Sequence, residues 1–164
     1  MVPPTRGGSP VHLDSAAEDG SGSQSDFDGA VEAFRKALRT YVTGDPIAVM
    51  KLFSRREDVT LANPLGPPRR GPAEVDAAAA DGAAMLRDGS VRGFEEVTRY
   101  STPDLGYVVQ IERTQARLPD VDKIVPIALR VTMVFRREGA SWKVAHRHAD
   151  PITSPRPVST TIES

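Results

Sequence analysis

The sequence predicts a single α+β domain in which helices cover one side of a largely antiparallel sheet. Two observations lead to this prediction. Helical spacing of apolar residues dominates the chain before about residue 90, and four alternating runs rich in β-branched residues follow, up to residue 150. Helices that precede a run of antiparallel strands in this way are typical of α+β folds. With 164 residues, the chain has room for one such domain with a real core.

Composition excludes several classes of function. The formal net charge of −1 gives no basic surface for nucleic acid or an anionic membrane. The absence of cysteine excludes disulfides and thiolate chemistry. No run approaches the roughly 20 apolar residues that a membrane span needs, and the N-terminus lacks the apolar segment of a secretory signal. We therefore expect a cytoplasmic protein without nucleic-acid or membrane partners.

The two ends of the chain are poor in large apolar side chains. Residues 1–25 are rich in Gly, Ser, Pro and Asp, so they bury too little to offset the entropy of ordering, and we expect a disordered arm. Prolines among Ser and Thr after Asp150 predict a flexible tail over residues 151–164. The folded domain is expected to span residues 26–150.

Three stretches carry helical patterns. The first begins at Asp26, a residue type that caps helix N-termini, and ends at Gly44. Its apolar residues recur at helical spacing: Phe27, Ala30, Val31, Phe34, Ala37, Leu38, Tyr41 and Val42. Asp45 followed by Pro46 opens a second helix. The alanine-rich residues 72–86 form the third, and their small side chains indicate close packing against a sheet.

The remaining segments predict strands and the turns between them. Residues 58–63 form a short strand, which Pro64 ends. Later strands are expected at 91–102, 105–118, 124–136 and 142–148, with a tight hairpin between the last two. The order is therefore helix, helix, strand, helix and then four strands.

Strand periodicity also assigns side chains to faces, because successive residues point to opposite sides. Glu112 and Arg130 lie on adjacent strands, and we expect both to point into the interior and pair there. Trp142, His146 and His148 are expected to share one face of the last strand. Charged and imidazole groups on a covered face require partners or a wet cavity, which favours a pocket at this place.

The element order, the turn Thr43-Gly44-Asp45-Pro46 and the terminal strand of residues 142–148 together resemble the NTF2-like superfamily. Within it the chain is most similar to SnoaL-like and ketosteroid-isomerase-like bacterial proteins. The resemblance covers residues 26–150. It implies a cone-shaped α+β barrel, with three N-terminal helices packed on a curved, mainly antiparallel sheet. It further implies a deep pocket between sheet and helices, and a homodimer formed through the sheet.

A comparison with the ketosteroid isomerases tests the resemblance at single residues. Their general base is an Asp at a strand end, whereas this chain has Asn63 in the matching Ala-Asn-Pro-Leu-Gly segment. An amide cannot shuttle a proton near neutral pH. Their oxyanion-donating tyrosine falls near Ala37, one helical turn from Tyr41. Their acidic donor on the penultimate strand has no match, since Arg130 occupies that strand. Isomerisation by that mechanism is therefore not expected.

Several of these residues allow more than one hypothesis about their role. Glu112 and Arg130 would form a pocket ion pair that orients a ligand, a structural cross-strand pair, or two unrelated surface charges; in the related kinase-association branch, arginines occupy corresponding pocket regions. His146 and His148 would act as general base and orienting partner, or face the outer surface at a dimer interface. Asn63 would bind a ligand carbonyl or cap its turn.

The His146, His148 and Asp150 spacing would suit a metal only weakly, because Pro151 bends the chain after it; no metal or cofactor is expected.

The preferred hypothesis is a protein that binds a small hydrophobic ligand, with Glu112, Arg130, Asn63, Tyr41 and Trp142 as binding residues. The first alternative is a cofactor-independent acid/base enzyme that uses His146 and His148. It would be an isomerase, cyclase or dehydratase acting on a polyketide- or steroid-like substrate. The second alternative is a non-catalytic dimeric assembly module on the same fold.

Overall fold

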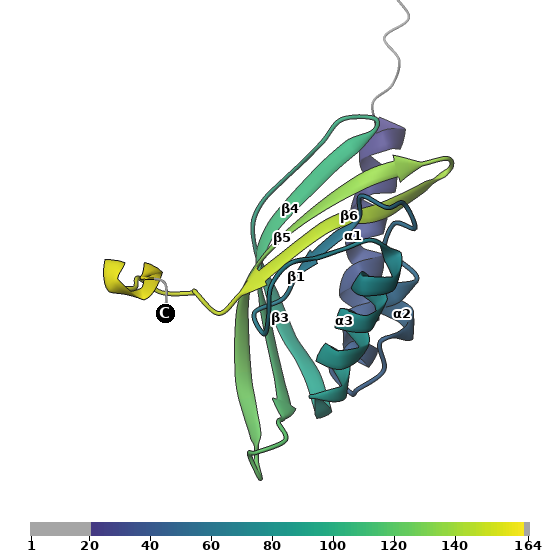
Figure 1. The fold of residues 1–164 in the computed structure, drawn as a ribbon. Coiled ribbons are helices and arrows are strands. Elements are labelled where there is room, and N and C mark those ends of the chain that lie inside the picture. Colours follow the sequence, from purple (N-terminus) through teal and green to yellow (C-terminus); the bar gives the residue numbers. More distant parts are fainter. Residues whose placement is uncertain (1–20, 163–164) are drawn as a thin grey trace, which may run out of the picture.

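The computed structural model describes residues 21–162, which form an α+β fold on one six-stranded sheet (Figure 1). The α-helices are α1 (Ser21–Tyr41), α2 (Ile47–Met50) and α3 (Pro72–Ala84). The strands are β1 (Thr60–Ala62), β2 (Arg69–Arg70), β3 (Arg87–Ser101), β4 (Leu105–Arg117), β5 (Ile124–Glu138) and β6 (Ser141–Asp150). A short 3-10 turn, η1 (Val158–Thr161), follows in the segment that leaves the sheet after β6.

The sheet has the strand order β2-β1-β6-β5-β4-β3. The four long strands β3 to β6 form an antiparallel meander, and β1 joins it in parallel beside β6, so the sheet is mixed. Thr60 pairs with His146 and Ala62 with His148 across this parallel contact. The C-terminal end of β1 is thereby fixed next to the middle of β6, which is where the candidate site lies.

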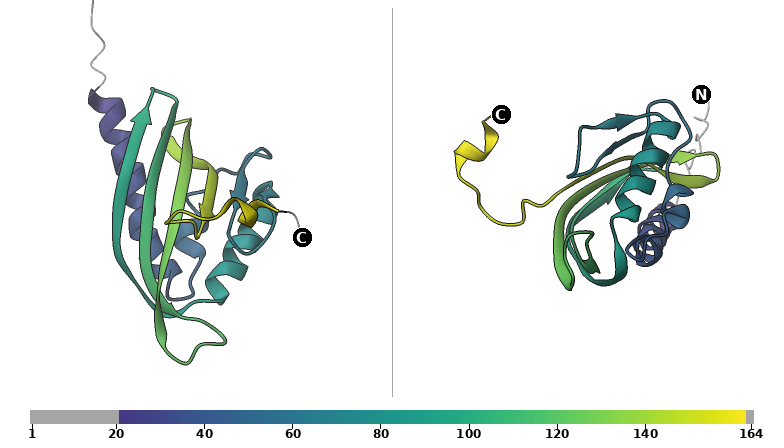
Figure 2. Two further views of the ribbon diagram at one scale, coloured as in Figure 1. Left: turned by 90° about the vertical axis from the view of Figure 1, so that its left-hand side faces the viewer. Right: turned by 60° about the horizontal axis from the view of Figure 1, so that its bottom comes forward.

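Helices α1 and α3 lie on the same, concave side of the curved sheet (Figure 2). The apolar stripe of α1 is buried there, and Phe27 packs its ring against Phe135 at 5.6 Å and Trp142 at 5.3 Å between centroids. About two turns further on, Phe34 meets Phe53 at 6.3 Å. Burial of each such ring contributes on the order of 2–3 kcal/mol, so α1 is the main helical support of the sheet.

Strand pairing determines which residues face the helices. Val108, Gln110 and Glu112 of β4 are buried on this inner face, as the alternation predicts. Residues directly opposite each other in an antiparallel pair share a face. Gln110 is opposite Val131 and Glu112 is opposite Leu129, so the odd-numbered residues of β5 point inward. Even-numbered residues of β5 therefore point to the outer face.

A β-bulge interrupts this regular pattern between β5 and β6. Val134 pairs with His146, but the next residue, Phe135, pairs with Val144. Ala145 is thus an extra residue on β6, and two residues there oppose one on β5. Val144 points inward and is fully buried on one side of the bulge, and the side-chain alternation restarts on the other.

Before the bulge, the even-numbered residues of β6 point inward; after it, the odd-numbered residues do. Arg147 and Ala149 point inward and are buried, whereas His146 and His148 point to the outer face. Without the bulge, the two histidines would share the face of Trp142. The bulge therefore decides which ionisable residues of β6 reach the interior.

Three details of the fold differ from the sequence expectation. Helix α1 begins at Ser21 and not at Asp26, so it includes five residues assigned to the N-terminal arm; residues 1–20 lie outside the described part. The expectation of three N-terminal helices packed on the sheet is not matched, because α2 is only a single turn of 4 residues. The loop before α3 also contains β2, whose two residues pair with β1.

Gly89 of β3 provides a test of how closely α1 and the sheet approach. A Cβ atom at this position would overlap the backbone carbonyl of Val42, which cannot rotate away. We expect Gly89→Ala to lower the free energy of unfolding by about 2–3 kcal/mol, as overpacking does elsewhere. The measurement is urea unfolding followed by circular dichroism.

Gly29 is the matched control, since it is exposed on α1 and has no atom within 4 Å of an added Cβ. There the same substitution should raise stability by about 0.5–1 kcal/mol, because alanine favours the helix. Equal effects of the two substitutions would contradict the close approach.

Candidate functional site

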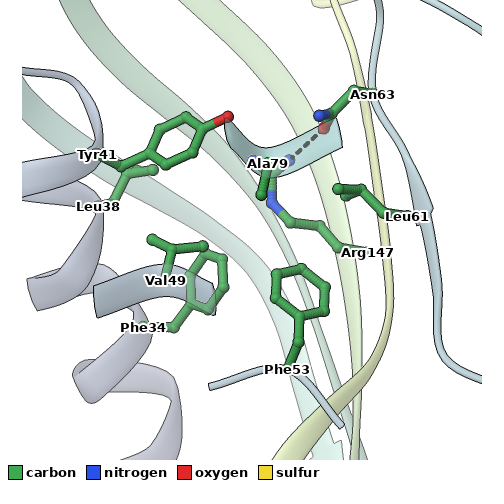
Figure 3. A pocket seen from close by; sticks show the side chains of 9 residues that line it. All are labelled: Phe34, Leu38, Tyr41, Val49, Phe53, Leu61, Asn63, Ala79 and Arg147. Carbon is green, nitrogen blue, oxygen red and sulfur yellow. Dashed lines mark hydrogen bonds between the residues drawn. The ribbon is translucent and has the colours of Figure 1, made fainter. Parts of the chain in front are cut away.

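A small cavity lies between the inner face of the sheet and the helices (Figure 3). The polar part of its lining consists of Tyr41 from α1, Asn63 just after β1, and Arg147 from β6. The apolar walls are Phe34, Leu38, Val49, Phe53, Leu61 and Ala79. The cavity among these side chains has a volume of about 20 Å³, which is room for about one water molecule. The site is therefore narrow and largely apolar, with three polar groups gathered in it.

Arg147 and Glu112 form a buried ion pair beside this cavity. Arg147 Nη2 donates to Glu112 Oε2 at 2.6 Å, and the two side chains are 9% and 3% exposed. Charge-assisted hydrogen bonds of this length are among the strong ones in proteins. Because each charge would be costly to bury alone, each one holds the other in the interior.

The second oxygen of Glu112 is also occupied. Gln110 Nε2 donates to Glu112 Oε1 at 3.2 Å. The amide oxygen of Gln110 accepts two hydrogen bonds from Arg35 of α1, at 3.0 Å from Nε and 2.6 Å from Nη2. Arg35 in turn pairs with Glu96 of β3 at 2.7 Å. A chain of polar contacts thus runs from the cavity along the inner face to the surface.

Arg147 makes one further polar contact. Its Nη1 donates to Asn63 Oδ1 at 3.3 Å, and its guanidinium lies 5.9 Å from the ring centre of Phe34. Its Nε is buried with no hydrogen-bond partner among the described residues. Since the oxygen of Asn63 faces the guanidinium, the Nδ2 amide group of Asn63 remains able to donate to another molecule.

The hydroxyl of Tyr41 lies next to that amide group. An added Cβ at Gly82 of α3 would overlap Tyr41 Oη and come within 3.7 Å of Asn63 Nδ2, so both polar atoms approach the bare backbone there. Burial raises the pKa of Tyr41; the charge of Arg147 opposes this rise and that of Glu112 adds to it. The hydroxyl therefore stays protonated at neutral pH and can donate a hydrogen bond.

The arrangement is suited to binding an uncharged oxygen acceptor. Tyr41 and Asn63 supply two neutral donors, and the guanidinium of Arg147 is already compensated by Glu112. Both oxygens of Glu112 accept hydrogen bonds within the fold, so this carboxylate is held as a structural partner of Arg147. Among the residues that line the cavity, none is a histidine or a carboxylate.

The expectation that Arg130 points inward and pairs with Glu112 is wrong. Arg130 lies on the outer face with its side chain 49% exposed, and it donates to Asp150 Oδ2 from Nη2 at 2.8 Å. The reason is the strand register. Glu112 is opposite Leu129, so Arg130 falls on the other side of the sheet.

His146 and His148 do not reach the cavity either. They lie on the outer face, where His146 Nδ1 shares a hydrogen bond of 2.8 Å with Thr60 Oγ1. His148 is exposed, and its Nε2 is 3.6 Å from Asp150 Oδ2. Burial, followed by the charge of His148, lowers the pKa of His146. The expected shared face with Trp142 is lost because of the bulge at Ala145.

Trp142 points inward but belongs to a different cavity. It is buried between Phe27 and the guanidinium of Arg137, which lies 5.4 Å from its ring centre. The space next to it, about 290 Å³, is lined by Asp26, Ala30, Ala33, Leu52, Phe135, Ala140 and Trp142 itself. None of these residues lines the Arg147 cavity, so Trp142 is not brought together with Tyr41 and Asn63.

Residues 21–162 hold no group of three or more His, Cys, Asp or Glu side chains placed to bind a metal ion. They also hold no helix that is long and apolar enough to cross a membrane.

A family model described as the SnoaL-like domain matches residues 31–153. The chain belongs to the SnoaL-like family. The matched region includes all of the residues that line the Arg147 cavity. A search of curated proteins by sequence found no match.

Solved structures share the fold of this SnoaL-like chain. A candidate dehydratase of the NTF2-like family from Streptomyces avermitilis is 22% identical, with a TM-score of 0.67 over 82% of this chain and 99% of that one. A candidate calcium/calmodulin-dependent protein kinase type II association domain from Thiobacillus denitrificans is 25% identical, with a TM-score of 0.61 over 76% and 93%. An NTF2-like superfamily protein from Salmonella enterica is 11% identical, with a TM-score of 0.70 over 88% and 100%.

Arg147 is the residue of this SnoaL-like site that the sequence analysis missed. Regular alternation along β6 placed it on the face opposite Trp142 and Val144. One signal pointed to a partner of this kind: a buried Glu112 requires a cation nearby. Once Arg130 is excluded by register, Arg147 is the cation that a bulge brings inward.

The buried ion pair leads to a prediction about the free energy of unfolding. Glu112→Gln keeps the shape of the side chain but leaves Arg147 buried without its counter-charge, so we expect a loss of about 3–5 kcal/mol in the free energy of unfolding. Arg130→Ala on the outer face should cost less than about 1 kcal/mol, because its pair with Asp150 is partly exposed. Chemical denaturation of both variants measures this difference, and a larger loss for Arg130→Ala would contradict the assignment.

Proposed function

We propose that this SnoaL-like protein binds a small, hydrophobic, uncharged ligand through an acceptor oxygen, such as a carbonyl, that accepts hydrogen bonds from Tyr41 and Asn63 at the border of the cavity beside Arg147. The body of the ligand would occupy the adjoining cavity of about 240 Å³, which shares Leu61 and Asn63 with the first. The observation that supports this most directly is the convergence of Tyr41 Oη and Asn63 Nδ2 at Gly82, on the border of an apolar cavity. A few placed polar groups in an apolar concave lining are the usual composition of a small-molecule site.

The charge of the ligand follows from the ion pair. Glu112 compensates Arg147, so a ligand carboxylate would bring an uncompensated negative charge into the interior. A carbonyl or hydroxyl oxygen adds no charge and accepts hydrogen bonds from Tyr41 and Asn63. The unpartnered Nε of Arg147 is a further donor near the same space. We infer a neutral ligand for this reason.

Binding is preferred here over acid/base turnover. One neighbour of known structure is described as a candidate dehydratase, but at 22% identity this likeness supports the fold only. The enzyme alternative required His146 and His148 as base and partner, and both lie on the outer face. The acceptor oxygen of the ligand would therefore meet hydrogen-bond donors and no histidine or carboxylate among the residues that line the Arg147 cavity.

Removal of the Tyr41 hydroxyl, by Tyr41→Phe, tests this proposal. Acetophenone and ethylbenzene share a carbon skeleton but only the first has a carbonyl oxygen. In Tyr41→Phe we expect about 5–10-fold weaker binding of acetophenone, the worth of one hydrogen bond, and ethylbenzene affinity within about twofold of the original protein. Isothermal titration calorimetry measures both compounds.

Tyr107→Phe is the matched control, because Tyr107 is exposed on the outer face and its hydroxyl lies far from the cavity lining. This variant should leave both affinities unchanged. Failure of acetophenone to bind the original protein would contradict the proposed function, and an equal effect of the two tyrosine substitutions would contradict the role of Tyr41.

We also propose that the outer face of the sheet packs against a second copy of the chain. The described helices lie on the inner side only, and half-buried Val109, Ile111 and Val134 lie on the outer face beside the exposed Tyr100 and Tyr107. Extended apolar surface of this kind is typical of an interface. A pair of identical faces can close by twofold symmetry.

Sedimentation velocity at micromolar concentration tests this assembly. We expect a mass of about twice 17.7 kDa for the original chain. Val109→Glu, which places a charge in the middle of the face, should give the monomer mass, whereas Lys36→Glu on the exposed side of α1 should not. A monomeric original chain would overturn the dimer.

A further inference from the structure

Two histidines of β6 stand on the outer face of the sheet, where they take no part in the cavity beside Arg147. His146 and His148 pair with Val134 and Thr132 of β5, so the strand is regular between them and both side chains leave the same face. Two residues along a strand span about 6.6 Å. Imidazole is the commonest metal ligand in proteins and suits zinc, nickel and copper. The two rings are therefore close enough to bind one metal ion together.

Each of these imidazoles has one ring nitrogen next to a neighbouring oxygen. Nδ1 of His146 shares a hydrogen bond of 2.8 Å with the hydroxyl of Thr60, and Nε2 of His148 lies 3.6 Å from Oδ2 of Asp150. The other nitrogen of each ring makes no hydrogen bond with residues 21–162. Metal-binding histidines have this arrangement, because one nitrogen ligates while an oxygen beside the other sets the tautomer and the orientation of the ring.

One chain supplies too few ligands for a closed metal site. A structural zinc ion takes four ligands in a tetrahedral arrangement. The described part of the chain brings no three possible ligands together at one point. The carboxylate of Asp150 is already engaged, because it accepts from Arg130 at 2.8 Å and from the backbone of Ile152 at 2.8 Å. The remaining ligands of a site at His146 and His148 therefore have to come from another molecule.

The position of the histidines points to a second copy of the chain as that molecule. Strands β5 and β6 are the two middle strands of the six, so both histidines lie near the middle of the face that we propose as the dimer interface. In a twofold interface, residues close to the axis meet their own counterparts. Two histidines from each copy give four imidazoles, the number that a tetrahedral zinc ion takes.

We propose that His146 and His148 of two copies together bind one divalent transition-metal ion, such as Zn²⁺, between the outer faces of the two sheets. The inference rests on the dimer proposed above and adds to it a metal site that is incomplete in either copy alone. Thr60 and Asp150 are then positioning residues, which orient the imidazoles from outside.

The charges around the two rings are compatible with a bound cation. Burial, followed by the charge of His148, lowers the pKa of His146, which favours the neutral imidazole that a metal requires. Arg130 lies diagonally across from His148 on β5, and its guanidinium is paired with Asp150. The repulsion that this guanidinium would exert on a metal ion is thereby reduced.

The experiment titrates the full chain with Zn²⁺, after removal of metal with EDTA, by isothermal titration calorimetry and sedimentation velocity. We expect one Zn²⁺ for two chains and a dimer that dissociates less readily when the metal is present. His146→Ala and His148→Ala should each abolish this half-molar stoichiometry. Thr60→Val should keep it and weaken Zn²⁺ binding about 10–100-fold, as the loss of an outer partner does elsewhere.

His12→Ala is the matched control, because His12 is the third histidine of the chain and lies outside the described residues. It should leave the stoichiometry unchanged and the affinity within about twofold, well short of the loss that a missing ligand or outer partner causes. Co²⁺ in place of Zn²⁺ adds a spectroscopic readout, since its visible absorption reports tetrahedral coordination. Circular dichroism confirms the folding of each variant.

The outcomes separate the metal site from the dimer. A chain that is dimeric without metal and binds no Zn²⁺ overturns the metal site and leaves the dimer standing. One Zn²⁺ for each chain, or unchanged binding in both His146→Ala and His148→Ala, also overturns the bridging site. A chain that dimerises only with Zn²⁺ supports the site and shows that the sheet faces alone are insufficient. A chain that is monomeric with and without Zn²⁺ overturns both.

Discussion

The interior of this protein depends on one buried ion pair, Glu112 with Arg147. Neither side chain could remain in the core without the other, because a lone buried charge costs several kcal/mol. The pair is also tied to its surroundings. Gln110 donates to the carboxylate and accepts from Arg35, and Asn63 accepts from the guanidinium. The polar groups that face the cavity are therefore oriented by a chain of contacts that begins at the surface of α1.

Two features of the sheet place Arg147 beside Glu112 and Asn63. The bulge at Ala145 turns Arg147 inward, and the parallel pairing of β1 with β6 places Asn63 beside it. A sheet with uninterrupted alternation would have buried His146 and His148 against the helices and left Glu112 without a cation. Bulges commonly redirect side chains in this way near functional sites. The bulge is thus the local feature that most determines the chemistry of the interior.

The sequence was sufficient for those features that depend on local periodicity. Apolar spacing predicted the inner face of α1, and alternation placed Glu112 and Gln110 inside β4. It failed for Arg130 and the histidines, because the face of a strand residue depends on register with its neighbours, and a bulge shifts that register by one residue. No residue type near Ala145 marks the shift. Polar Ser, Gly and Gln at residues 21–25 likewise concealed the start of α1.

Small residues on α3 complete this account of the site. The alanine-rich sequence predicted close packing, and at Gly82 the reason is the space needed by Tyr41 and Asn63. Glycine inside a helix costs about 1 kcal/mol relative to alanine. Arg147 Nε is buried and has no hydrogen-bond partner among the described residues. Both features oppose stability, and both lie around the same cavity. Local costs that gather in one place are expected where binding, and not folding, has selected the residues.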